Sequence, residues 1–129
     1  FIPGKRPMST MNPVIVKNKD NDISIITGSP GGSFIPAAAL RVITGIIDFN
    51  LDVGQATMLP RIHKDWPYAG LEYESTLSSD IVSVLERLGH QPEASKTLGS
   101  TQSISIIDGI NYGYADLRRP NAGVAIQVD

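Results

Sequence analysis

The chain has 129 residues, a length that suits a single domain with one hydrophobic core. Hydrophobic residues make up 41% and charged residues 19%, a balance that excludes an intrinsically disordered or fibrous protein. The net charge of -2 argues against nucleic acid as a partner, and the absence of cysteine excludes disulfides, a thiolate nucleophile and cysteine-ligated zinc. No apolar stretch is long enough for a membrane segment.

The N-terminal third predicts a hairpin followed by a helix. Residues 14–16 and 23–26 are short β-branched runs on either side of a polar segment, which is typical of a β-hairpin. A glycine-rich loop follows at 28–32, and Ser33 is placed to cap a helix. Apolar residues then recur at steps of three and four, which predicts one buried helical stripe: Ile35, Ala39, Val42 and Ile46.

The middle of the chain predicts two further helices. One covers 55–59 and ends at Pro60, and the other begins at Ser79 and ends at Gly89. Residues 61–71 lie between them and are rich in Trp, Pro and Gly. We therefore expect an irregular segment there.

In the C-terminal part, apolar residues recur at every second position. Isoleucines alternate with serines from Gln102, and Asp108-Gly109 supplies the type I′ turn of a second hairpin. A final strand is expected at 122–128. The pattern as a whole predicts an α+β fold with about five antiparallel strands and two or three helices. No linker or internal repeat divides residues 1–129, which we predict to form one domain.

The loop at 27–33 joins the end of a strand to the start of a helix. Free backbone N–H groups and the positive end of a helix can hold an anion or a developing oxyanion at such a place. No lysine follows the glycines, so the loop is not a nucleotide-binding P-loop. Taken alone, Gly31 and Gly32 are better explained as a turn that needs positive φ.

Two adjacent hydroxyls, Ser9 and Thr10, lie in a segment that Pro7 and Pro13 keep extended. Adjacent side chains of an extended segment point in opposite directions, so both could meet one ligand only at a kink. By themselves they are better explained as a solvent-facing pair.

The two histidines, His63 and His90, show no metal-ligand spacing, and we expect neither a metal nor a cofactor. Arg61 lies close to Trp66, where it could stack on the indole ring or pair with a carboxylate.

Asp116 stands beside Arg118 and Arg119 at the expected end of a strand. A local salt bridge explains this grouping as well as a ligand does.

Taken together, the motifs resemble those of γ-glutamyltranspeptidases, in the same order along the chain. They are PGKRPMSTMNP at 3–13, TGSPGG at 27–32, PRIH at 60–63 with Trp66, and GSTQS at 99–103. The resemblance covers essentially the whole chain and corresponds to the C-terminal two-thirds of the small subunit in that family.

The resemblance implies an N-terminal-nucleophile hydrolase with an α-β-β-α sandwich, to which this chain contributes part. In that family a precursor cleaves itself and exposes a threonine that attacks the γ-glutamyl amide, and the acyl group passes to water or to an amino acid or peptide. Glutathione and other γ-glutamyl compounds are the implied substrates. Ser9 and Thr10 match the pair that binds the glutamyl α-carboxylate, and Gly31 and Gly32 match the oxyanion hole.

Three positions depart from the family pattern. Thr10 stands where a second serine is usual, Asn12 where serine is common, and Leu117 where an Asp-Pro-Arg motif has proline. None of these changes removes a chemical group that the site requires.

The nucleophilic threonine and the arginine that pairs with the substrate carboxylate in the family have no counterpart in this sequence. We therefore expect a fragment that holds half a site, needs the large subunit and the first part of the small subunit, and self-associates when isolated. A bacterial member would be periplasmic or secreted. Two alternatives stay open: a non-catalytic binding or oligomerisation module, and a related acylase or poly-γ-glutamate hydrolase.

Overall fold

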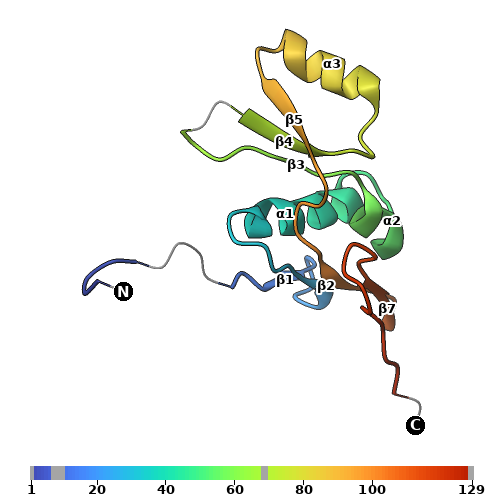
Figure 1. The fold of residues 1–129 in the computed structure, drawn as a ribbon. Coiled ribbons are helices and arrows are strands. Elements are labelled where there is room, and N and C mark those ends of the chain that lie inside the picture. The colour runs from blue at the N-terminus through green and yellow to red at the C-terminus, as the bar shows by residue number, and fades with distance from the viewer. Residues whose placement is uncertain (1, 7–10, 68–69, 128–129) are drawn as a thin grey trace.

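The computed structural model describes residues 2–6, 11–67 and 70–127, and it contains the predicted N-terminal hairpin (Figure 1). Strands β1 (Val14–Lys17) and β2 (Ile23–Gly28) run antiparallel. In the turn between them, the Asn18 side chain accepts hydrogen bonds from the backbone N–H groups of Asp20 and Asp22, each 2.9 Å long. This side chain therefore satisfies backbone donors that the strand ladder leaves free.

A second predicted hairpin completes the main sheet. Strands β6 (Gln102–Ile107) and β7 (Ile110–Ala115) flank Asp108 and Gly109, whose φ angles of 51° and 77° fit the expected type I′ turn. Strand β6 pairs with β2, so the four-stranded sheet has the order β1-β2-β6-β7 and is antiparallel throughout.

Two helices cover one face of this sheet. Helix α1 (Phe34–Ile47) packs against β2, and the short helix α2 (Val53–Met58) packs against β7. The two helices approach closely, because a Cβ atom at Gly45 would lie 2.9 Å from the Cβ of Ala56. Of the predicted stripe on α1, three residues are buried and one is half-buried: Ile35, Ala39 and Val42, then Ile46.

A second, smaller sheet lies on the other side of α1 (Figure 1). It has the order β3-β4-β5 and consists of β3 (Ile62–His63), β4 (Gly70–Glu74) and β5 (Gln91–Ser95), with the predicted helix α3 (Ser79–Arg87) between the last two strands. The prediction of an irregular segment at 61–71 is wrong where β3 and the start of β4 lie. These strands are too short to show alternation in the sequence, and β4 and β5 pair in parallel across the α3 crossover.

The predicted strand at 122–128 is absent from the part of it that the structure describes, 122–127. These residues cross the face of the sheet instead of pairing at its edge, since a Cβ atom at Gly113 would lie 3.0 Å from Val124 Cγ1. A segment in that position cannot form ladder hydrogen bonds with β7.

The three helices and the antiparallel main sheet confirm the predicted α+β class. The alternation on β6 is also present, but its buried side carries Ser103 and Ser105, whereas Ile104 on the other side is 38% exposed. Ser103 shares a buried hydrogen bond of 2.8 Å with Thr27 of β2. Among the described residues, no helix is long and apolar enough to span a membrane.

Candidate functional site

The glycine-rich loop leaves β2 and enters α1 at Gly31 and Gly32, whose φ angles are +136° and +60°. Such angles suit glycine, which lacks a Cβ atom. The carbonyl groups of both glycines accept hydrogen bonds from the first turn of α1, at 3.1 Å from Phe34 N and 3.3 Å from Ile35 N. Among the residues that the structure describes, none accepts a hydrogen bond from the N–H of either glycine. Within the described part of the chain, the loop therefore presents two N–H groups without an acceptor at the start of a helix.

Two consequences follow for the chemistry of this loop. Unpaired backbone donors at a helix N-terminus attract negative charge, whether on a bound anion or on an oxygen that becomes negative during a reaction. The loop also borders an open groove of about 400 Å³, whose other walls include Phe34, Gly99, Ser100 and Arg119. A small compound could reach the loop at Gly31 from this groove.

The other predicted binding residues, Ser9 and Thr10, lie outside the residues that the structure describes. Their expected role as a carboxylate-binding pair stays a prediction.

Ser33 occupies the N-cap position of α1, but the expected capping hydrogen bond is absent. Its own backbone is helical, with φ -66° and ψ -22°, so the hydroxyl does not reach back to the helix. Asp65 pairs with His63 Nε2 at 2.9 Å, and this hydrogen bond foremost, followed by a contribution from Ser33, lowers the pKa of the Asp65 carboxyl. The His63 ring packs edge-on against Phe34 with 4.8 Å between centroids.

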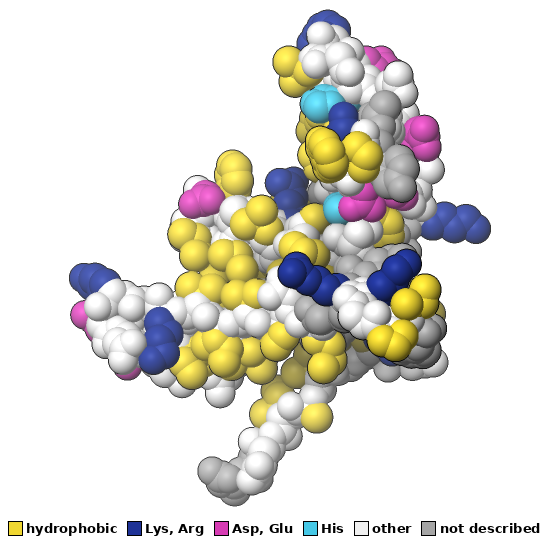
Figure 2. All heavy atoms as spheres, turned by 90° about the vertical axis from the view of Figure 1, so that its left-hand side faces the viewer, with side chains coloured by type: hydrophobic (Ala, Val, Ile, Leu, Met, Phe, Trp, Pro, Cys, Tyr) yellow, Lys and Arg dark blue, Asp and Glu magenta, His cyan; other side chains and the backbone are white. Residues whose placement is uncertain are grey.

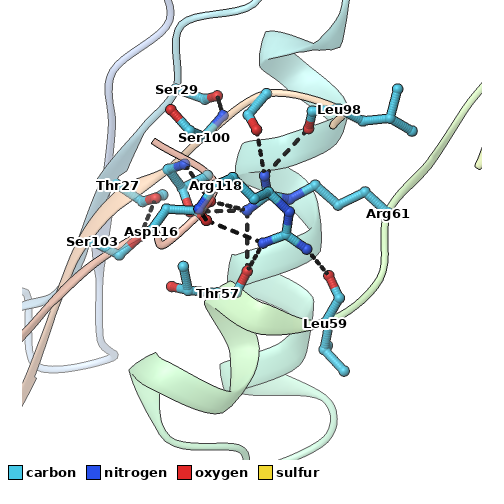
Figure 3. Close-up of polar contacts among 12 residues, drawn as sticks. Thr27, Ser29, Thr57, Leu59, Arg61, Leu98, Ser100, Ser103, Asp116 and Arg118 are labelled. Atoms are coloured by element: carbon cyan, nitrogen blue, oxygen red, sulfur yellow. Dashed lines mark hydrogen bonds and ion pairs between the residues drawn. The ribbon is translucent and has the colours of Figure 1, made fainter. Parts of the chain in front are cut away.

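Behind the loop lies a cluster of buried charges centred on Arg61 and Asp116 (Figure 3). Arg61 is 2% exposed and Trp66 is 92% exposed, so the arginine pairs with a carboxylate and does not stack on the indole. Its Nη2 atom lies 2.7 Å from Asp116 Oδ2, and its Nη1 atom donates to the carbonyl oxygens of Leu98 and Gly99 at 3.3 and 2.9 Å.

A second arginine joins the same cluster. Arg118 forms two parallel hydrogen bonds with Glu74, from Nε at 2.7 Å and from Nη2 at 2.6 Å. It also contacts Asp116 at 3.2 Å, which confirms the predicted local salt bridge and extends it to Arg61. Two positive and two negative side chains therefore balance one another in the interior, as buried charges require.

Hydrogen bonding sets the protonation of this cluster. Burial alone would raise the pKa of Asp116, but the N–H groups of Arg118 and Thr101 and the guanidinium of Arg61 outweigh it and lower that pKa. For Arg118, burial would lower the pKa, yet the hydrogen bonds and charge of Glu74 raise it above its ordinary value. Burial lowers the pKa of Arg61, which nevertheless stays charged, as arginine does in proteins. Asp116, Arg61 and Arg118 are therefore charged near neutral pH.

Sequence reasoning did not single out Glu74, which lies 44 residues from its partner Arg118. Glu74 follows Glu72 by two residues, and nothing in this short segment indicates which glutamate is buried; only the fold brings Glu74 to the two arginines. Among the described residues, no group of three histidine or acidic side chains could hold a metal ion.

Comparison with known proteins places this chain in one family. The family model for gamma-glutamyltranspeptidase matches residues 1–126. The glutathione hydrolase proenzyme of Escherichia coli is 42% identical over 117 residues, which cover 90% of this chain and 20% of the relative. That of Bacillus subtilis is 33% identical over 129 residues, which cover 98% of this chain and 22% of the relative. The chain thus spans about a fifth of the length of these relatives.

Solved structures agree with this assignment. A variant of Helicobacter pylori gamma-glutamyltranspeptidase matches with a TM-score of 0.83 and 33% identity over 92% of this chain and 66% of that chain. The enzyme of Pseudomonas nitroreducens matches with a TM-score of 0.84 and 27% identity over 98% of this chain and 67% of that chain. By sequence and by fold, this chain belongs to the gamma-glutamyltranspeptidase family.

Proposed function

We propose that this chain is part of an enzyme that cleaves the γ-glutamyl amide bond of glutathione and related compounds. The γ-glutamyl group then passes to water or to an amino acid or peptide. The observation that carries the proposal is the pair of N–H groups of Gly31 and Gly32, which find no acceptor in residues 2–6, 11–67 and 70–127 and lie between the end of a strand and the start of a helix. The names of the related glutathione hydrolases support the choice of substrate.

The loop acts where negative charge develops. A threonine at the N-terminus of the small subunit, outside these 129 residues, attacks the amide carbonyl carbon while its own α-amine takes the hydroxyl proton. The carbonyl oxygen becomes an oxyanion, and the N–H groups of Gly31 and Gly32 donate to it. The α-ammonium group then gives this proton to the amide nitrogen, the C–N bond breaks, and the amine leaves. The acyl group stays as an ester on the threonine, which water or an acceptor amine then cleaves through a second oxyanion. The same donors therefore serve both halves of the reaction.

Ser9 and Thr10 bind the α-carboxylate of the γ-glutamyl group in this proposal. Two hydroxyl donors suit a carboxylate acceptor because they add no competing charge. Since the carboxylate keeps its charge throughout the reaction, this contact is equally strong in the ground state and the transition state.

One face of the main sheet carries apolar side chains that no helix of this chain covers in the described residues. Ile15, Ile26 and Ile104 are cross-strand neighbours on the sheet face away from α1 and α2, and Ile15 is 60% exposed. Figure 2 shows apolar side chains gathered on the lower half of the molecule, above the C-terminal tail. We propose that the remainder of the enzyme packs on this face, since contiguous exposed apolar patches mark contact sites.

A direct test compares the isolated 129-residue chain with the mature enzyme that contains it, using a chromogenic γ-glutamyl anilide. The enzyme is expected to turn the substrate over and the chain to be inactive and self-associated, as measured by sedimentation and by binding of a hydrophobic dye. Ser9→Ala in the enzyme is expected to raise KM much more than it lowers kcat. An enzyme that is silent on γ-glutamyl anilides would support the non-catalytic alternative, whereas preference for a glutaryl or polymeric substrate would support the related acylase or poly-γ-glutamate hydrolase.

A further inference from the structure

Ser29 ties the glycine-rich loop to a distant part of the chain. Its Oγ atom accepts a hydrogen bond from the backbone N–H of Ser100 at 3.1 Å (Figure 3). It also donates one to the carbonyl oxygen of Pro30 at 2.6 Å. The two serines are 71 residues apart. Among the described residues, this is the one hydrogen bond that joins residues 29–32 to any segment beyond the start of α1.

The segment that Ser29 contacts, Gly99 and Ser100, is itself held by hydrogen bonds. The carbonyl oxygen of Gly99 lies 2.9 Å from Nη1 of Arg61, which belongs to the buried charge cluster. Because Arg61 is also paired with Asp116 at 2.7 Å, the peptide between Gly99 and Ser100 is held by the interior of the protein. The hydrogen bond from this peptide to Ser29 therefore restrains the position of the glycine-rich loop.

Packing at this contact leaves little freedom. A Cβ atom at Gly99 would lie 2.7 Å from Ser29 Oγ, and one at Gly31 would lie 3.3 Å from Gly99 Cα. The two backbones therefore meet directly, with the Ser29 hydroxyl beside the point of contact. Gly31 and Gly32 follow Ser29 by two and three residues, so a change in its hydrogen bonds is transmitted to their N–H groups.

We infer that Ser29 is a positioning residue that aims the N–H groups of Gly31 and Gly32 at the oxyanion. This inference rests on the proposed function. Donors stabilise an oxyanion without reorganisation only if they are held in place beforehand, and a displacement of about 1 Å at a reacting centre can cost about a hundredfold in rate. The Ser29 hydroxyl needs no contact with the substrate for this role.

The test is Ser29→Ala in the mature enzyme, with Ser33→Ala as a matched control. Both variants remove one serine hydroxyl near the start of α1, but among the described residues only Ser29 hydrogen-bonds the Gly99–Ser100 peptide. Ser29→Ala is expected to lower kcat on a γ-glutamyl anilide about 10- to 100-fold with KM within threefold. Ser33→Ala is expected to leave both constants within threefold. Hydrogen–deuterium exchange of a peptide covering 27–35 is expected to quicken in Ser29→Ala alone.

The results distinguish failure of the proposed function from failure of the positioning role of Ser29. Absence of turnover by the parent enzyme would overturn the proposed function and the role of Ser29 with it. Turnover by the parent together with an unchanged kcat in Ser29→Ala would overturn the positioning role only. An equal loss in Ser33→Ala, or a lower kcat with unchanged exchange in the loop, would also overturn it.

Discussion

The glycine-rich loop and the charge cluster behind it treat their polar groups in opposite ways. In the cluster, Asp116 and Glu74 together face Arg61 and Arg118 in the interior, and each carboxylate oxygen accepts hydrogen bonds. In the loop, the N–H groups of Gly31 and Gly32 find no acceptor among the described residues. The carboxylates of the cluster accept their hydrogen bonds from the protein itself, whereas the loop keeps its donors available.

The cluster fixes neighbouring chain segments, whereas the loop can donate hydrogen bonds to a bound group. Breaking a buried ion pair is strongly destabilising, so the cluster fixes the chain segments that it touches, including the carbonyl groups of Leu98 and Gly99. Because the loop packs against Gly99, its backbone is held in place even though the N–H groups of Gly31 and Gly32 find no acceptor among the described residues. A rigid support of this kind is what electrostatic preorganisation requires.

The largest expected effect comes from removing the shared carboxylate with Asp116→Ala. Four hydrogen bonds to Asp116 are lost, from Arg61, from Thr101 and two from Arg118, and the cluster keeps an excess positive charge. The free energy of unfolding of the mature enzyme should fall by about 3–5 kcal/mol. Soluble yield and urea unfolding measure this loss.

Asp20→Ala is the control for that change, because Asp20 lies exposed in the turn between β1 and β2. Its effect should stay within about 0.5 kcal/mol. A loss below about 1 kcal/mol for Asp116→Ala would show that the cluster does not hold the fold.

The contrast between loop and cluster also explains what the sequence could predict. Local patterns were enough for both hairpins, for α1 and for the glycine loop, because turn residues and apolar spacing act over a few positions. The charge cluster depends on pairs 44 and 55 residues apart, Glu74 with Arg118 and Arg61 with Asp116, and no local pattern specifies such pairs.

Three strands were not predicted, β3, β4 and β5, and the first two are held together by a long-range contact of the same cluster. The backbone N–H of Arg61, just before β3, donates to Glu74 Oε2 at the end of β4. The roles of Gly31 and Gly32 came from resemblance and not from geometry, and they remain proposals.

A smaller effect is expected from the loop itself, where the two glycines should respond differently to alanine. At Gly31 the φ angle is +136° and a Cβ atom would lie 3.3 Å from Gly99 Cα, so the backbone must shift. At Gly32 the φ angle is +60° and the space is open, so alanine costs roughly 1–2 kcal/mol of backbone strain. We expect Gly31→Ala to lower kcat about 100- to 1000-fold with little change in KM, and Gly32→Ala to lower it less.

Both glycine variants need a check that the precursor still matures and folds, by gel analysis and thermal unfolding, before the rates are compared. A kcat within threefold of the parent for a correctly folded Gly31→Ala enzyme would remove the oxyanion assignment. The loop would then be a turn that uses glycine for its backbone conformation alone.

The smallest effect concerns acid, and it tests the cluster without disturbing its packing. The pKa of Asp116 is lowered in the folded protein, so the folded state binds this proton less readily than the unfolded chain does. Its contribution to stability is therefore complete above the ordinary aspartate pKa of about 3.9 and is lost as the pH falls through the lower, folded pKa. Each unit between the two values corresponds to about 1.4 kcal/mol. The free energy of unfolding, measured in urea between pH 5 and 3, should fall less steeply for Asp116→Asn than for the parent, because the amide does not titrate. NMR titration of the Asp116 carboxyl carbon in the parent gives an independent value, and a midpoint at or above about 3.9 would contradict the assignment of this carboxylate as the charged centre of the cluster.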